Sequence, residues 1–166
     1  MVQEQPGPLP GFVAGRCYDG MMDARRRRFS EDELEALVGA TAAALPRHPE
    51  VIAAWLFGSV ARGEPARDVD VGVLLAGTSD DPFLATRIAT DIEESGASLG
   101  LEVDVRPLRR TGPRFRRNVL ADGRLIYDPA PAVRVPVEAR WMSEWLDFRP
   151  VWERMRRAML DGWLQG

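Results

Sequence analysis

The sequence is poor in cysteine, histidine and lysine, which form many metal and catalytic sites. It has one cysteine, one histidine and no lysine among its 166 residues, so all 22 basic residues are arginine. A single cysteine, Cys17, excludes a disulfide framework and a cysteine-based zinc site within one chain. The only histidine, His48, lies in a turn next to proline, and we expect it at the surface. We attribute the lack of lysine to genome base composition.

Long apolar runs are also absent. No stretch is long enough for a transmembrane helix, and the N-terminus lacks the order of segments found in a secretory signal. We therefore expect a cytoplasmic protein that does not act at a membrane. The formal net charge of −3 argues against direct binding of nucleic acid, which usually requires a strongly basic face. Hydrophobic residues make up 45% of the chain, which is enough for a buried core.

The chain divides into three predicted parts. Residues 1–29 hold several prolines and glycines without a period and are typical of a flexible tail. Residues 30–128 contain alternating helix and strand signals, and predict an α/β core. Residues 129–166 are helical by pattern and are expected to pack on the core or on a partner.

Within the core, a capping box over residues 30–33 predicts a first helix from about Glu31 to Leu45. Short apolar runs bounded by turn residues predict the strands. A helix with Leu84, Ile88 and Ile92 on one face is expected to begin near Pro82. The expected strands are Val51–Phe57, Asp68–Ala76, Leu101–Leu108 and Arg124–Tyr127, with a further helix over Pro113–Leu120.

Two apolar stripes mark the C-terminal segment. Each has helical spacing, which usually indicates core packing but also suits a partner surface. Pro150 separates them. The first comprises Val133, Val137, Trp141 and Trp145, and the second Trp152, Met155, Met159 and Trp163.

Three aspartates are the candidate catalytic residues. Asp68 and Asp70 are two residues apart on a strand, so their carboxylates face the same side. Such close like charges repel unless a cation lies between them, and carboxylate oxygens suit Mg²⁺. Asp104 lies on a strand with a similar apolar pattern, and we expect the two strands to be neighbours. Three acids would then form a site for two metal ions.

The turn after the first predicted strand has the features of a phosphate-binding site, which would complement the metal-binding acids. Glycine at Gly58 allows a phosphate to approach the backbone, and the amides of a short helix starting at Ser59 would face an anion. Arg62, one turn further on, is expected either to contact phosphate or to pair with an acid of the site. We therefore assign Gly58, Ser59 and Arg62 to nucleotide binding.

A basic cluster follows the third predicted strand. Three interpretations remain open for it: a solvated rim, a contact with an acidic partner, or a contact with nucleotide phosphates. The cluster consists of Arg109, Arg110, Arg114, Arg116 and Arg117.

The motif Gly58-Ser-Val-Ala-Arg-Gly-Glu64, followed by Asp68-Val-Asp70, resembles the signature of the DNA polymerase beta-like nucleotidyltransferase superfamily. Residues 113–127 and 146–150 resemble later segments of the minimal nucleotidyltransferase (MNT) antitoxins, and the likeness extends from about residue 30 to the C-terminus. Arg67 departs from the motif, since many members have serine before the first aspartate.

The resemblance implies a nucleotidyltransferase fold, with a short mixed sheet flanked by helices and C-terminal helices. It implies transfer of AMP from ATP to a tyrosine hydroxyl of a HEPN-type ribonuclease toxin, encoded next door, with the chain acting as its antitoxin. Asp68, Asp70 and Asp104 would hold Mg²⁺ and carry the catalysis. Two alternatives stay open: a small-molecule nucleotidyltransferase of the antibiotic-modifying type, and an antitoxin that neutralises its toxin by binding alone.

Overall fold

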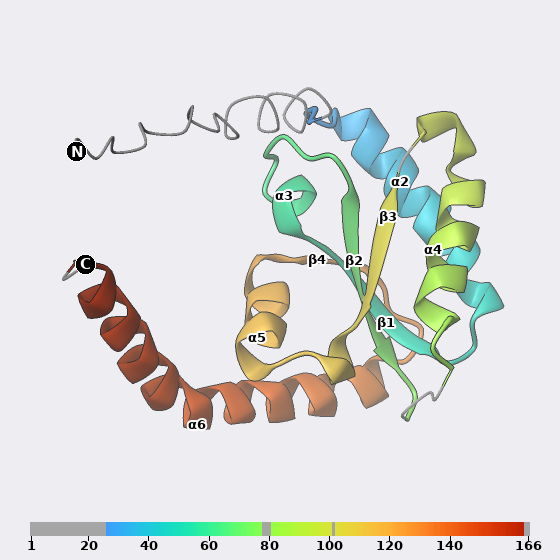
Figure 1. Ribbon diagram of the computed structural model, residues 1–166. Coiled ribbons are helices and arrows are strands. Elements are labelled where there is room, and N and C mark those ends of the chain that lie inside the picture. Colours follow the sequence, from blue (N-terminus) through green and yellow to red (C-terminus); the bar gives the residue numbers. More distant parts are fainter. Residues whose placement is uncertain (1–25, 78–80, 101, 165–166) are drawn as a thin grey trace, which may run out of the picture.

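The computed structural model describes residues 26–77, 81–100 and 102–164 of the chain, and these contain a sheet and the helices that flank it (Figure 1). The bounds of the elements follow in chain order: α2 Glu31–Ala44, η1 Leu45–Arg47, β1 Val51–Phe57, α3 Gly58–Ala61, β2 Val69–Leu75, α4 Leu84–Ser95, η2 Ala97–Leu99, β3 Val103–Pro107, η3 Leu108–Arg110, α5 Pro113–Asp122, β4 Arg124–Tyr127 and α6 Pro131–Leu164.

The sheet has the strand order β3-β2-β1-β4. β1 pairs antiparallel with β2 and β4, whereas β2 and β3 are parallel. The parallel pair is possible because α4 provides the crossover connection that parallel strands need. The short mixed sheet flanked by helices that the sequence predicts is therefore confirmed.

Helices α2 and α4 cover one face of the sheet (Figure 1). The i, i+4, i+8 stripe of α4 is buried there, as predicted, because a helix of this length buries one apolar face against a sheet. This first core includes Leu37 of α2, Ile88 and Ile92 of α4, and Val69, Val71 and Val73 of β2.

The opposite face of the sheet is covered in part by α5 and the first half of α6. Side chains at alternate strand positions point to this face. Its core includes Trp55 of β1, Leu74 of β2, Leu108, Val119 of α5 and Trp141 of α6. The candidate acids lie on the same face, in the part that neither helix covers. The second core therefore lies next to the candidate site.

The C-terminal segment forms one helix of 34 residues, α6, although Pro136 and Pro150 lie inside it. The helical C-terminal segment that the sequence predicts is therefore confirmed, as one continuous helix. Proline removes one backbone hydrogen bond and bends a helix without necessarily ending it, and α6 does change direction along its length (Figure 1).

The two apolar stripes of α6 differ in their surroundings. Trp141 of the first stripe is buried in the second core, whereas Met155 and Met159 of the second stripe are 46% and 55% exposed. The side chain of Trp163 lies outside the described residues. In residues 26–77, 81–100 and 102–164, no helix has the length and apolarity needed to cross a membrane.

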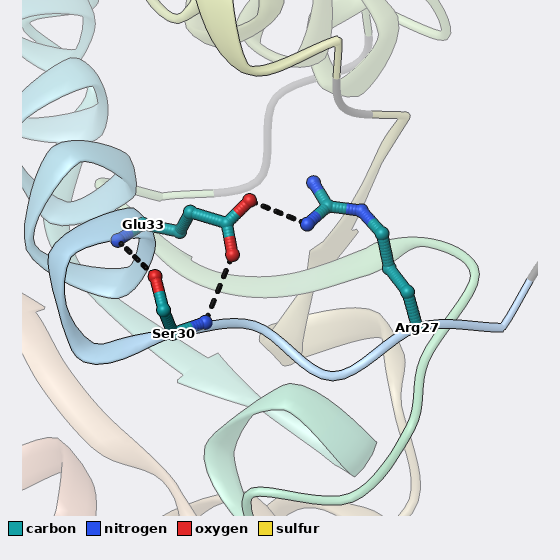
Figure 2. A network of polar contacts seen from close by, with 3 residues as sticks. All are labelled: Arg27, Ser30 and Glu33. Atoms are coloured by element: carbon teal, nitrogen blue, oxygen red, sulfur yellow. Dashed lines mark hydrogen bonds and ion pairs between the residues drawn. The ribbon is translucent and has the colours of Figure 1, made fainter.

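The N-terminus of α2 is closed by the predicted capping box (Figure 2). The Ser30 side chain accepts a hydrogen bond from the amide of Glu33 at 3.2 Å, and the Glu33 carboxylate accepts one from the amide of Ser30 at 2.8 Å. Arg27 forms an ion pair with Glu33. Arg27 and Ala66 also exchange two backbone hydrogen bonds of 2.9 Å. Residues 26–29, assigned to the tail, therefore attach to the loop that precedes β2.

His48 is buried, contrary to the surface position expected from its turn. Its Nε2 lies 2.7 Å from Oδ2 of Asp91 on α4, and only 8% of the residue is exposed. The local sequence did not reveal this position because Asp91 is distant along the chain and approaches only when α4 packs beside η1. The pair links these two elements on the first face.

We predict that His48→Ala lowers the free energy of unfolding by about 1–3 kcal/mol, because it leaves the partly buried Asp91 without this partner. The matched control is Arg47→Ala. Arg47 lies 3.9 Å from the same carboxyl group but is 57% exposed, so its loss should change stability by about 0.5 kcal/mol or less. Urea denaturation measures both variants, and equal effects would contradict the assignment.

Candidate active site

The strand β1 runs directly into a turn at Gly58, where α3 begins. Gly58 has φ +73, in the left-handed region that favours glycine. A Cβ at this position would lie 2.1 Å from Oδ2 of Asp70. Phe57 pairs with Asp70 across β1 and β2, which explains the close approach. The turn and the acid therefore touch, and this contact requires a residue without a side chain.

The three predicted acids come from two neighbouring strands. Asp70 on β2 is paired in register with Asp104 on β3, so both carboxylates belong to the same face of the sheet. Asp68 lies one residue before β2 and two before Asp70. The prediction that the two acid-bearing strands are neighbours is confirmed.

The surroundings of Asp70 disfavour its charged form. Burial raises the pKa of the Asp70 carboxyl, and the negative charges of Asp68 and Asp104 raise this pKa further. The positive charges of Arg106 and Arg62 act in the opposite direction. Partial burial among like charges is the situation in which a bound cation is most favourable.

Arg106 is a site residue that the sequence analysis missed. Its Nε and Nη2 donate hydrogen bonds of 2.9 and 2.8 Å to Oδ2 of Asp104. The pKa of Arg106 is raised, chiefly by the hydrogen bond to Asp104 and also by the charges of Asp70 and Asp68. The available signal was its position two residues after Asp104 on a strand, which places both side chains on one face. Arg106 balances part of the negative charge.

The chemistry of the acids fits a divalent cation. Three carboxylates provide hard oxygen ligands of the kind that Mg²⁺ prefers. The Asp70 carboxylate lies directly against the Gly58 turn, because glycine has no side chain to separate them. In the described part of the chain, however, no three His, Cys, Asp or Glu side chains form a group that could hold a metal. Asp104 is engaged by Arg106 instead. The two-ion site therefore stays a prediction.

Of the predicted phosphate-binding residues, Gly58 and Ser59 begin α3, and Arg62 directly follows its end. The carbonyl of Ser59 accepts backbone hydrogen bonds from Arg62 and Glu64, which shapes the turn. The Arg62 guanidinium forms an ion pair of 2.8 Å with Glu64, and both side chains are about half exposed. Of the two roles expected for Arg62, pairing with a catalytic acid is not observed, because Glu64 is its partner.

Most of the basic cluster is engaged within the fold. Arg109 donates to the carbonyl of Leu75 at 2.9 Å, and Arg116 forms an ion pair of 3.0 Å with Glu144. Arg114 lies 4.1 Å from the ring centre of Trp152 on α6. These contacts show that the cluster helps to fix α5 and α6, and they leave its predicted roles toward phosphate or a partner as predictions.

The central part of the chain matches a known protein family. The family model described as "Polymerase beta, Nucleotidyltransferase" matches residues 41–131, which is more than half of the chain and includes the Gly58 turn and all three acids. A search of the curated proteins gave no match.

Solved structures share the fold at low identity. A crystal structure of a toxin–antitoxin with AMP-PNP is 20% identical, with a TM-score of 0.58 over 76% of this chain and 98% of that chain. A tri-AMPylated Shewanella oneidensis HEPN toxin in complex with MNT antitoxin gives 19% identity and a TM-score of 0.57 over 78% and 98%. The toxin–antitoxin MntA-HepT gives 18% and 0.56 over 78% and 98%. The predicted nucleotidyltransferase fold is confirmed.

We predict that Gly58→Ala destabilises the protein more than Gly77→Ala does. Both glycines have positive φ, +73 and +70, so both variants acquire backbone strain of about 1–2 kcal/mol. Only at Gly58 would the new Cβ overlap another side chain, that of Asp70. Adding Asp70→Ala to Gly58→Ala should recover the excess. Urea denaturation measures all three variants, and equal losses at both glycines would contradict the contact.

Asp70 gives a pH-dependent prediction. Because its pKa is raised on folding, ionised Asp70 destabilises the metal-free fold, and this cost disappears as the pH falls and the carboxyl is protonated. We expect Asp70→Asn in EDTA to have a higher melting temperature than the unsubstituted protein at neutral pH. The gain in free energy of unfolding should be about 1 kcal/mol or less, because Asp70 is only partly buried. The difference should shrink toward about pH 4. Thermal melts across this range test it, and a lower melting temperature for Asp70→Asn at neutral pH would contradict it.

Proposed function

Because this chain belongs to the polymerase beta nucleotidyltransferase family, we propose that it is an Mg²⁺-dependent adenylyltransferase that acts as an antitoxin. It transfers AMP from ATP to a tyrosine hydroxyl of a HEPN-type toxin encoded by a neighbouring gene. The observation that carries the proposal is the placement of Asp70, in register with Asp104 and in contact with the Gly58 turn. This arrangement brings acids suited to a metal beside a turn suited to phosphate.

The similar solved structures support the choice of acceptor. One of them contains AMP-PNP with a toxin–antitoxin, and another contains a tri-AMPylated HEPN toxin with an MNT antitoxin. The described residues of this chain share the fold of these structures. A protein hydroxyl is therefore favoured over a small molecule as the acceptor.

In the proposed reaction, Asp68, Asp70 and Asp104 hold Mg²⁺, which when bound neutralises phosphate charge and lowers the pKa of the acceptor hydroxyl. The backbone at Gly58 and Ser59 orients the triphosphate. The acceptor oxygen forms a bond to the α-phosphorus, and the bond from that phosphorus to the β-phosphate oxygen breaks, which releases pyrophosphate. Asp104 receives the proton of the acceptor hydroxyl.

Arg106 has a defined part in this scheme. Both of its hydrogen bonds go to Oδ2 of Asp104. In the absence of substrate, its positive charge therefore reduces the electrostatic repulsion among the acids. With Mg²⁺ held by Asp68, Asp70 and Asp104, the Arg106 guanidinium would be available to pair with phosphate oxygens, which it contacts well. Half of its side chain is exposed, which leaves room for this movement.

A second candidate is neutralisation by binding alone. The observation that favours it is the exposure of the second half of α6, where Val151, Met155, Met159 and Leu160 are 40–55% exposed. Exposed apolar side chains at helical spacing are suited to a protein partner. This role does not require the acids, so the two candidates are separable by experiment.

We predict that the protein, incubated with ATP, Mg²⁺ and the product of the neighbouring gene, adds the mass of AMP to that product. Asp68→Asn/Asp70→Asn should lower the initial rate by about 1,000-fold or more, since metal-dependent charge stabilisation supplies several kcal/mol. The matched control is Asp32→Asn, an exposed acid in the first turn of α2, which should retain full activity. Intact-mass spectrometry measures the product.

Growth assays with the toxin complete the test. If the double variant neutralises the toxin as well as the unsubstituted protein does, and no AMP is found on the toxin, binding alone is the mechanism. If AMP is added only in the presence of the intact acids and toxicity falls with it, adenylylation is the mechanism.

A further inference from the structure

Residues 26–29, which we call the strap, are bound to residues 62–68, the loop between α3 and β2. The amide of Arg27 donates a hydrogen bond of 2.9 Å to the carbonyl of Ala66, and the amide of Ala66 donates one of 2.9 Å to the carbonyl of Arg27. The two residues form an isolated antiparallel bridge. Nη1 of Arg28 donates a longer hydrogen bond, of 3.4 Å, to the carbonyl of Gly63 in the same loop.

The strap is also anchored to the start of α2. The Arg27 guanidinium forms an ion pair with Glu33, whose carboxylate accepts the amide of Ser30 in the capping box (Figure 2). The same guanidinium lies 4.3 Å from the ring centre of Phe29, and this ring packs against the first core. Arg27 therefore joins α2, through its side chain, to the loop, through its backbone.

The loop ends in one of the three candidate acids. Asp68 is exposed, lies two residues after the bridge at Ala66 and precedes the first residue of β2. Within residues 65–68, the backbone hydrogen bonds found in the described part of the chain are the two that Ala66 exchanges with Arg27. The other tie is an exposed ion pair of 3.5 Å between Arg67 and Glu102. The other two acids are paired within the sheet, so Asp68 depends most on the strap.

We propose that the strap positions Asp68 for metal binding, and that Arg27 is the positioning residue. The inference rests on the proposed function for the role of Asp68 as a ligand of Mg²⁺. It adds that a segment outside the catalytic strands sets the place of this ligand. A carboxylate on a segment that is already fixed loses less conformational freedom when a cation binds. Replacing residues that orient metal ligands commonly lowers metal affinity by about 10- to 100-fold.

Charge and positioning predict opposite effects of replacing Arg27. Removal of a positive side chain makes the surroundings more negative, which by itself favours a bound cation. Loss of a positioning contact disfavours the cation, because Asp68 is then free to leave the site. A fall in Mg²⁺ affinity after replacement of Arg27 therefore identifies positioning.

The experiment measures the binding of Mg²⁺ alone to the full chain by calorimetry. Arg27→Ala should weaken Mg²⁺ binding by about tenfold, and Arg27→Lys, which retains a cation beside Glu33, should restore most of this loss. The matched control is Arg26→Ala. Arg26 is exposed and makes no hydrogen bond or ion pair within the described part of the chain. This variant has the same change of charge and should bind Mg²⁺ at least as tightly as the unsubstituted protein.

A double-mutant cycle separates positioning from a general loosening of the fold. In an Asp68→Asn background, Arg27→Ala should change Mg²⁺ affinity by less than about twofold, because no carboxylate remains at that position for the strap to place. Hydrogen exchange of the Ala66 amide reports on the strap itself. This exchange should be faster in Arg27→Ala and unchanged in Arg26→Ala.

Two results would overturn the role of the strap. One is unchanged or tighter Mg²⁺ binding in Arg27→Ala, which would leave the strap as a structural tether only. The other is an equal fold loss in the Asp68→Asn background, which would indicate general damage to the fold. Absence of Mg²⁺ binding to the unsubstituted chain would contradict both this role and the proposed function. Mg²⁺ binding that depends on Arg27 as predicted, with no transfer of AMP to the partner, would contradict the proposed function alone.

Discussion

The contact between Gly58 and Asp70 is the constraint on which the site depends. A strand must end, turn with positive φ and start a helix, all within van der Waals reach of a carboxylate on the next strand. The register of β1 and β2 sets this distance, since Phe57 is paired with Asp70. The buried valines of β2 hold that register, because a shift by one residue would turn them to the other face and expose them.

The two faces of the sheet differ in composition and in role. The first, under α2 and α4, is packed mainly with apolar side chains and fixes β2 and β3 side by side. The second is apolar only beneath α5 and α6, and its uncovered part carries the acids. Burial and the negative charges of the neighbouring acids raise the pKa of Asp70 there, so the ionised carboxyl is disfavoured in the absence of a cation. Such a cost is common where a site is shaped for a ligand rather than for the fold.

Much of the fold and of the candidate site was accessible from the sequence. Short apolar runs located all four strands to within one or two residues, and Ser30 with Glu33 located the start of α2. Strand periodicity placed Asp68 and Asp70 on one side and suggested Asp104 as their neighbour. Two kinds of feature were not accessible. The burial of His48 depends on its contact with Asp91, which is distant in sequence. The continuation of α6 through Pro150 was not accessible either, because a local pattern does not show whether a proline bends a helix or ends it.

The sequence by itself determined which residues are the candidates for the chemistry, because glycine, serine and alternating aspartates have restricted uses at the end of a buried strand. The tertiary structure alone decided their surroundings: the pairing of Asp104 with Arg106, of Arg62 with Glu64, and the approach of α5 to the Gly58 turn. Local patterns specify the direction of each side chain, but charge balance and clefts arise between elements that meet only after folding.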